Sequence, residues 1–238
     1  MEEAYIVAGF RSAVGKSGRG GFRNYRSDDL AVDIIKHLMA SVPELDPLLV
    51  DDVIVGCANP EGEQGLQVGR QISLRALGKE TPGFVINRYC ASGLEAISIA
   101  VAKIKANMGE CYIAGGAESM SLVPMTGYKL APSYQVAMDT PDYVVGMGLT
   151  AEAVAKKFNI SREQADAFST QSHAKAAAAI DGGLFTDEIV PVEVEEVFVA
   201  NDKRQSKKFI IDTDEGVRRD TTTEGLAKLV QRSLMVVL

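Results

Sequence analysis

The chain has 238 residues, of which 46% are hydrophobic, and it carries a formal net charge of −7. This length and composition allow a full core in one large domain or two smaller ones, and the acidic balance excludes nucleic acid as a general partner. No apolar run approaches the roughly 20 residues that a membrane-spanning helix needs, and the start MEEAYIVAGF is acidic where a signal peptide would be basic; we therefore expect a cytoplasmic protein with no membrane partner.

Short apolar runs alternate with helix-like periods in the first half of the chain. Buried strands are predicted at 4–10, 51–57, 83–87 and 111–117. Helices are predicted at 27–40, 65–78 and 92–109. Such alternation predicts an α/β fold with a mixed, mainly parallel sheet and helices on both faces.

After about residue 121 the sequence becomes richer in proline and glycine, which predicts an irregular segment as far as residue 148. Two helices are predicted next, and the second is opened by a capping box of Ser161 and Gln164. The alternating run 187–202 predicts a strand or hairpin, and Pro191 places it at a sheet edge.

These changes of texture predict two parts. Residues 1–120 form an N-terminal α/β domain, and residues 121 to about 229 form a second, more polar subdomain.

Cys90 stands where an apolar run ends and a helix-like stretch begins, within NRYCASGLEAI at 87–97. Ser92 and Glu95 match an S-x-x-E capping box, which predicts a helix start at about Ser92. Unpaired N–H groups and the positive end of the helix dipole favour a thiolate there, which suits a nucleophile, whereas the carboxylate of Glu95 opposes it by like-charge repulsion. Sequence does not give the net sign, and a buried structural cysteine remains the alternative.

The other cysteines, Cys57 and Cys111, end and begin predicted strands, and we predict that both are structural. Three cysteines without CxxC spacing indicate neither a disulfide framework nor a zinc site. We therefore predict free thiols and no metal.

The stretch 201–219 holds six cations against four carboxylates in an otherwise acidic chain. A local excess of cations suits contact with phosphate, and a solvated charged hairpin is the alternative. The cations are Lys203, Arg204, Lys207, Lys208, Arg218 and Arg219.

NRYCASGLEAI resembles the nucleophile signature of the thiolases, the acyl-CoA C-acyltransferases. FRSAVGKSGRGGF resembles their N-terminal loop, AGGAESMS a following motif, and MGLTAEAVA with ISREQADAFSTQSHAKA their inserted loop domain. The resemblance covers residues 4–229 almost without interruption. It implies a thiolase-like fold in which this chain represents the N-terminal half and the loop domain. On this basis residues 121–229 are an inserted α/β loop subdomain, and residues 230–238, beyond the resemblance, are an aberrant tail.

The resemblance implies that the Cys90 thiolate attacks the thioester of an acyl-CoA, releases CoA and holds the acyl group as a thioester. Condensation with acetyl-CoA, or the reverse thiolysis of a 3-ketoacyl-CoA, completes the reaction. The partners are thus acetyl-CoA or another acyl-CoA and free CoA, with coenzyme A as a substrate, no metal or redox cofactor, and a homodimer or tetramer for the intact family member.

The resemblance also assigns coenzyme A contacts to the loop domain. Met147 matches a residue of the pantetheine channel, Arg218 the arginine at the adenine end, and Leu229 another residue of that pocket. Gly146 stands where short-chain biosynthetic members tend to have histidine, which favours the degradative type and a role in fatty acid metabolism.

Three motifs that the family uses for proton transfer do not occur in these 238 residues: Asn-Glu-Ala-Phe, Gly-His-Pro and Cys-x-Gly. The resemblance breaks after Leu229, where VQRSLMVVL replaces the expected continuation. We expect a frameshift or premature stop that removes the last strand of the first half and the whole second half. The alternative function is therefore a catalytically incomplete fragment that acts only by association with a partner chain, or that has no function.

Overall fold

The computed structural model describes residues 3–230 and divides the chain into two compact units. The first unit contains the described residues up to Lys129 together with Thr186–Gly216. The second contains Leu130–Phe185 and the described residues from Val217 onward. Apart from Val230, the predicted tail at 230–238 lies outside the described residues.

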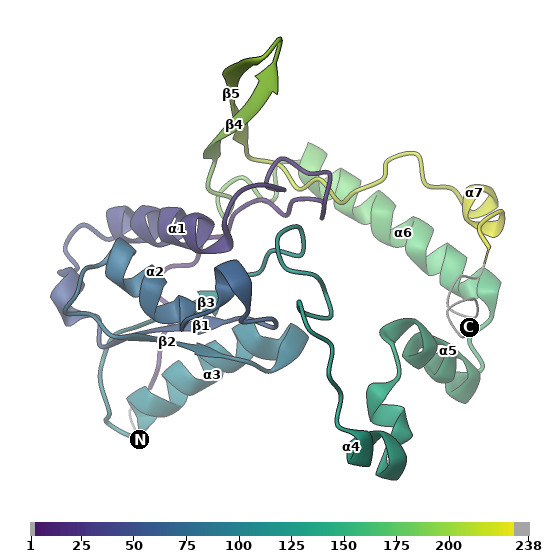
Figure 1. The fold of residues 1–238 in the computed structure, drawn as a ribbon, viewed down its shortest axis with the longest axis horizontal. Helices are drawn as coiled ribbons and strands as arrows, with labels where there is room; N and C mark the ends of the chain where they lie inside the picture. The colour runs from purple at the N-terminus through teal and green to yellow at the C-terminus, as the bar shows by residue number, and fades with distance from the viewer. Residues whose placement is uncertain (1–2, 231–238) are drawn as a thin grey trace. The chain divides into compact units, whose positions relative to one another are not determined.

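A parallel sheet forms the centre of the first unit (Figure 1). Its strands are β1 (Asp52–Gly56), β2 (Gly83–Ile86) and β3 (Tyr112–Gly116), in the order β2-β1-β3. Both strand pairs are parallel. All five residues of β1 are buried, as expected of a central strand whose middle residues, 53–55, are all apolar. The predicted parallel α/β architecture is confirmed.

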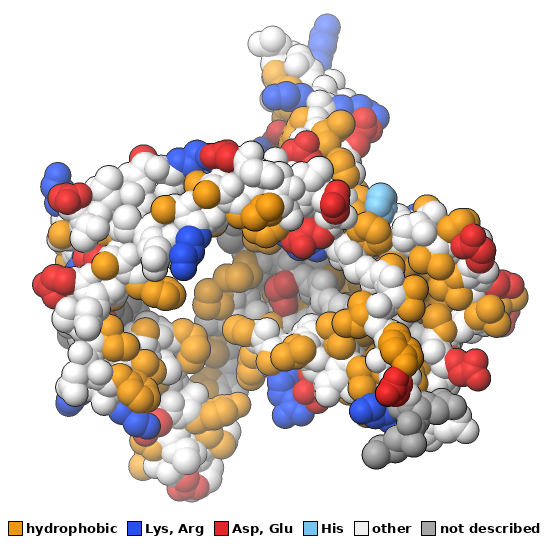
Figure 2. Space-filling view, turned by 180° about the vertical axis from the view of Figure 1, so that it is seen from behind, with side chains coloured by type: hydrophobic (Ala, Val, Ile, Leu, Met, Phe, Trp, Pro, Cys, Tyr) orange, Lys and Arg blue, Asp and Glu red, His pale blue; other side chains and the backbone are white. Residues whose placement is uncertain are grey.

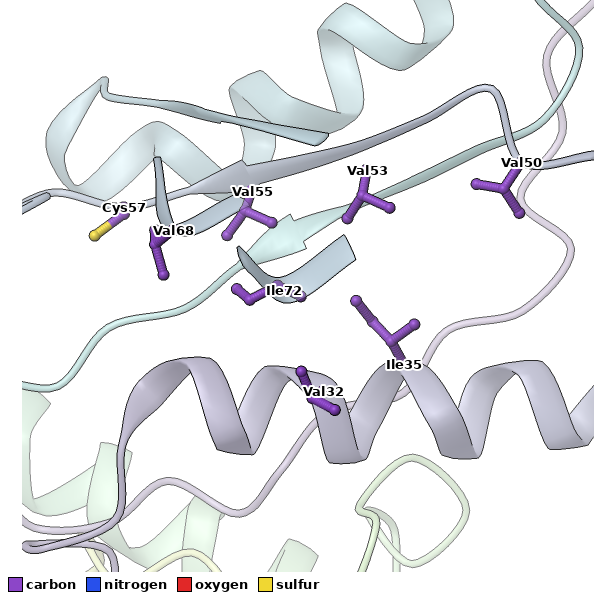
Figure 3. Packing of buried hydrophobic residues seen from close by; sticks show 8 residues of the cluster. All are labelled: Val32, Ile35, Val50, Val53, Val55, Cys57, Val68 and Ile72. Carbon is purple, nitrogen blue, oxygen red and sulfur yellow. The ribbon is translucent and has the colours of Figure 1, made fainter. Parts of the chain in front are cut away.

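Helices cover both faces of this sheet, because neighbouring residues of a strand point to opposite sides. Val53 and Val55 pack with Val32 and Ile35 of one helix and Ile72 of another (Figure 3). Ile54 points the other way and packs against a third helix. These helices are α1 (Ser27–Ser41), α2 (Val68–Ala76) and α3 (Ser92–Lys105).

The predicted strand at 4–10 is wrong. No strand is assigned there, and Tyr5, Ile6 and Val7 are 74%, 83% and 81% exposed. Phe10, the last residue of this segment, and the residues after it line a cavity of about 560 Å³ together with β3. They do not pair with β3 as a strand. An apolar run becomes a strand only where a neighbouring backbone supplies its hydrogen bonds, and β3 remains an outer strand of the sheet among the described residues.

An antiparallel hairpin completes the first unit. It consists of β4 (Val192–Ala200) and β5 (Lys203–Ile211). Asn201 and Asp202 both have positive φ, +51° and +58°, as a tight two-residue hairpin turn requires. Of the predicted alternatives for 187–202, the strand is therefore confirmed, and its hairpin partner lies beyond the predicted range.

The base of the hairpin packs on the N-terminal loop, where Ala13 and Phe22 join Val192, Val194 and Ile211 in one buried cluster. The compact units consequently differ from the predicted division at residue 120, because residues 186–216 return to the first unit.

Two carboxylates, three and four residues after the end of β5, fasten the same N-terminal loop. Arg11 donates to both carboxylate oxygens of Asp214, at 2.8 and 3.0 Å. Glu215 accepts from the backbone N–H groups of Lys16 and Gly21, at 2.8 and 2.9 Å.

The second unit is helical among its described residues. It contains α4 (Tyr134–Asp139), α5 (Met147–Phe158), α6 (Arg162–Asp181) and α7 (Thr223–Ala227). The capping box predicted at the start of α6 is present: Ser161 and Gln164 exchange both hydrogen bonds. None of the helices in the part of the chain that the structure describes combines the length and the apolar character needed to cross a bilayer.

Candidate active site

The carboxyl ends of all three parallel strands lie at one edge of the sheet, which is where α/β proteins place their ligand sites. The loops that follow β1, β2 and β3 therefore meet there, at residues 57–60, 87–91 and 117–121. Cys90 is in the middle loop.

Cys90 lies in a 3-10 turn, Tyr89–Ala91, between β2 and α3, and it is exposed to solvent. Cys57 is buried and Cys111 is half-buried. Burial, aided by the nearby carboxylate of Glu118, raises the pKa of the Cys57 thiol to about 12. Burial and Asp51 also raise the pKa of Cys111. Cys90 is thus the accessible thiol of the three, and the structural interpretation of Cys90 as a buried residue is excluded.

The backbone before Cys90 is strained. Tyr89 has φ +49°, a value that costs on the order of 1–3 kcal/mol for a bulky residue. Its N–H donates to Oδ1 of Asn87 at 2.8 Å, and its carbonyl accepts from Oγ of Ser92 at 2.6 Å. Local hydrogen bonds from both sides therefore hold this turn.

The predicted start of α3 at Ser92 is confirmed, but the predicted capping box is wrong. The residue that caps the helix is Ala91, which has no side-chain capping bond. Oγ of Ser92 instead accepts from the N–H of Arg88 at 2.8 Å, and Glu95 pairs with Arg88 Nη2 at 3.0 Å. Glu95 is thus paired with a cation and does not cap the helix.

Gly56, the last residue of β1, brings the sheet close to the start of α3. A Cβ placed on Gly56 would overlap the backbone of Ser92 and lie 2.6 Å from the backbone nitrogen of Gly93. The absence of a side chain at Gly56 therefore lets α3, and with it the Cys90 turn, rest directly on the sheet.

The three residues predicted to contact coenzyme A belong to the second unit. Met147 begins α5 and is 70% exposed. The backbone N–H of Arg218 donates to Nδ1 of His173 on α6 at 3.2 Å, and the carbonyl of Leu229 accepts from Arg162, the first residue of α6, at 3.1 Å. The backbones of Arg218 and Leu229 are therefore held at two points about three turns apart along α6.

His173 is a residue whose role sequence reasoning missed. On sequence it is an unremarkable histidine on a polar helix, for which an ordinary surface or packing role is expected. Its contact with the backbone of Arg218 spans 45 residues of chain, and no local pattern predicts such a contact.

The predicted cluster of cations at 201–219 is divided by the structure. Lys203, Arg204, Lys207 and Lys208 lie on β5 in the first unit, whereas Arg218 and Arg219 belong to the second. Figure 2 shows side chains of both charges over the hairpin at the top of the view, and Lys208 pairs with Glu193 at 2.8 Å. The four cations on β5 therefore fit the alternative interpretation, a solvated charged hairpin.

In the described part of the chain, no group of three or more His, Cys, Asp or Glu side chains is arranged to hold a metal ion.

Comparison with known proteins gives consistent matches. The family described as "Thiolase, N-terminal domain" matches residues 4–232. A 3-ketoacyl-CoA thiolase of Bacillus subtilis is 45% identical over 231 residues, 96% of this chain and 59% of that protein. A beta-ketoadipyl-CoA thiolase of Acinetobacter baylyi is 39% identical, again over 96% of this chain and 59% of that protein.

The crystal structure of an acetyl-CoA acetyltransferase of Bacillus anthracis superposes with a TM-score of 0.80 at 31% identity. This match covers 96% of the present chain and 58% of the acetyltransferase chain. The chain thus spans somewhat less than three fifths of the proteins it matches.

Proposed function

The chain belongs to the thiolase family, whose N-terminal domain matches residues 4–232, and on that premise we propose that it is an acyl-CoA C-acyltransferase that works through Cys90. The observation that carries this proposal is the exposed Cys90 thiol in the turn between β2 and α3. N–H groups at such a helix start stabilise negative charge on a thiolate or a developing oxyanion.

In the proposed first half-reaction, Sγ of Cys90 forms a bond to the carbonyl carbon of an acyl-CoA. The bond from that carbon to the CoA sulfur breaks, and the CoA thiolate leaves and takes up the proton given up by Cys90. In the second half-reaction, acetyl-CoA loses a proton and its carbanion bonds to the acyl carbon. The bond from that carbon to Sγ breaks, the Cys90 thiolate takes up the proton, and a 3-ketoacyl-CoA is released. Thiolysis runs the same steps backward.

Coenzyme A contacts are proposed for Met147, Arg218 and Leu229. Met147 and Leu229 are 70% and 56% exposed, and the exposed Arg218 has its backbone held by His173. An exposed guanidinium on an anchored backbone suits phosphate recognition.

The finer points of this function are also proposals. We infer acyl-CoA substrates of fatty acid metabolism, because several related proteins are named 3-ketoacyl-CoA thiolase. We further propose a cytoplasmic location, a homodimer or tetramer for the intact family member, and no metal or redox cofactor, with coenzyme A as a substrate.

Mass spectrometry of the purified chain after incubation with acetyl-CoA tests the proposal. We expect one acetyl group, located on Cys90, and none on a Cys90→Ser variant; a Cys57→Ser variant is the matched control and keeps the adduct. Absence of any adduct on the native chain would contradict acyl transfer through Cys90. Full thiolysis by this chain is expected to be orders of magnitude slower than by an intact thiolase, because catalytic groups that act as a unit fail together.

A non-catalytic role through association is a second candidate. It is favoured by the outer position of β3 and by the exposed side chains of Tyr5, Ile6 and Val7, since such edges and patches bind other chains. Mixing the chain with a full-length thiolase and measuring molar mass by light scattering decides: a mixed complex without Cys90 acetylation would support this candidate.

A further inference from the structure

A network of hydrogen bonds centred on Gln64 joins two of the loops at the carboxyl edge of the sheet. Gln64 is fully buried. Its Nε2 donates to the carbonyl of Asn59 at 2.8 Å and to Oε1 of Glu118 at 2.6 Å, and its Oε1 accepts from the N–H of Ser119. A buried amide with its hydrogen bonds satisfied makes a rigid connection; here it links the loop after β1 to the loop after β3.

The network continues to the loop that carries Cys90. Oε2 of Glu118 accepts from the N–H of Ala58 at 2.5 Å. The carbonyl of Ala58 accepts from Nδ2 of Asn87 at 2.9 Å, and Oδ1 of Asn87 accepts from the N–H of Tyr89 at 2.8 Å. Hydrogen bonds and intervening peptide units therefore run from the buried Gln64 to the residue before Cys90.

Tyr89 gives this connection its significance. Its positive φ persists only where the surroundings impose it, and its side chain cannot impose it by burial, because the residue is 65% exposed. Two hydrogen bonds hold the backbone of Tyr89: its N–H donates to Asn87, and its carbonyl accepts from Ser92. Ser92 is the first residue of α3, and Asn87 is held by the loop after β1 through Ala58.

We propose that Asn87 is a positioning residue for Cys90. Anchored to Ala58, and through Ala58 to Glu118 and Gln64, its amide fixes the turn so that Sγ of Cys90 meets an acyl carbonyl from the correct direction. The consequence for catalysis rests on the proposed acyl transfer; the geometry of the turn does not.

The test compares Asn87→Ala and Asn87→Ser with Asn24→Ala, an exposed asparagine in the loop before α1 that serves as the matched control. The rate of Cys90 acetylation by acetyl-CoA is measured beside the rate of its alkylation by iodoacetamide. We expect Asn87→Ala to slow acetylation about tenfold or more, because thioester attack depends on orientation. Alkylation of the exposed thiol should change less than about twofold, since it makes smaller demands on geometry.

Asn87→Ser should recover part of the loss, because a serine hydroxyl can also accept from the N–H two residues later. Asn24→Ala should acetylate at the native rate. Native acetylation by Asn87→Ala would overturn the proposal, as would a parallel fall of acetylation, alkylation and melting temperature, which indicates general loss of structure.

Hydrogen exchange at the Tyr89 amide separates this inference from the proposed function. If the native chain takes no acetyl group, the proposed function fails, but the positioning of the turn is still decided. The inference is upheld if the Tyr89 amide is protected from exchange in the native chain and loses this protection in Asn87→Ala, while the amides of β1 stay protected. An unprotected Tyr89 amide in the native chain overturns it.

Discussion

Cys57 and Cys90 both follow a strand at the carboxyl edge of the sheet, yet they differ in the chemistry open to them. Cys57 is 1% exposed, and Gln64 and Glu118 lie against its sulfur, at 3.5 and 3.8 Å. Burial with an adjacent carboxylate disfavours a thiolate at Cys57, whereas Cys90 is open to an incoming thioester.

Alkaline pH should therefore destabilise the first unit through Cys57. The folded-state pKa of about 12 lies above the ordinary value of 9.0, so the unfolded chain ionises first. The stabilising contribution is complete below about pH 9 and is lost as pH rises toward 12. Chemical denaturation across this range should show a shallower decline of the unfolding free energy for Cys57→Ala than for the native chain, after correction for the variant's lower stability at neutral pH. Equal slopes would contradict the assignment.

The contact between β1 and α3 depends on Gly56, because a side chain at this position would meet backbone that cannot rotate away. Gly56→Ala is expected to destabilise the chain by at least about 2 kcal/mol and to slow acetylation of Cys90. Gly93→Ala is the matched control: a Cβ there meets nothing within 4 Å, and alanine in a helix is favoured by up to about 1 kcal/mol. In urea denaturation, Gly56→Ala should thus lower the free energy of unfolding and Gly93→Ala should raise it. Equal changes in the two variants would refute the close-packing argument.

The clamp between Arg11 and Asp214 attaches the N-terminal loop to the end of β5. Its side chains are 32% and 17% exposed, and the hydrogen bond from Arg11 lowers the pKa of Asp214. A lowered pKa contributes stability above the ordinary value of 3.8, and this contribution is lost as pH falls through the folded-state pKa.

We expect Asp214→Asn to cost about 1–2 kcal/mol at neutral pH and to reduce the loss of stability on acidification. The exposed neighbour Asp212 provides the control, since Asp212→Asn should stay within about 0.5 kcal/mol. Denaturation at neutral and acidic pH gives the free energy of unfolding of both variants. If Asp214→Asn loses as much stability on acidification as the native chain, the clamp is not the cause of the acid sensitivity.

Sequence reasoning predicted the features that depend on a local pattern and missed those that depend on residues distant in the chain. The apolar run of β1, the helix start at Ser92 and the capping box of α6 follow from neighbouring residues. The segment 4–10 has equal strand character, but pairing is a tertiary property. Ser92 shows the same limit within the site, because an S-x-x-E pattern is compatible with hydrogen bonds to the preceding turn as well as with a cap.

The exposed apolar side chains at the N-terminus have a consequence for solubility. Ile6 and Val7 are more than 80% exposed, and outer strands such as β3 are templates for association. We expect the purified chain to aggregate at micromolar concentration, and Ile6→Lys combined with Val7→Lys to reduce light scattering severalfold. Leu48→Lys, at a residue 68% exposed in the short 3-10 helix Pro47–Leu49, should help less. A monodisperse native sample with a cooperative melt would contradict the expectation.

The hydrogen bonds between Arg11 and Asp214 join residues 203 positions apart. During synthesis at about 5–20 residues per second, Asp214 is made about 10–40 s after Arg11. All of Leu130–Phe185 is synthesised in that interval, so the residues of α5 and α6 are made before the residue that completes the clamp on the N-terminal loop. The parallel sheet that carries Cys90 is available earlier still, and a chaperone bound during this delay would meet the sheet before the hairpin that closes its unit.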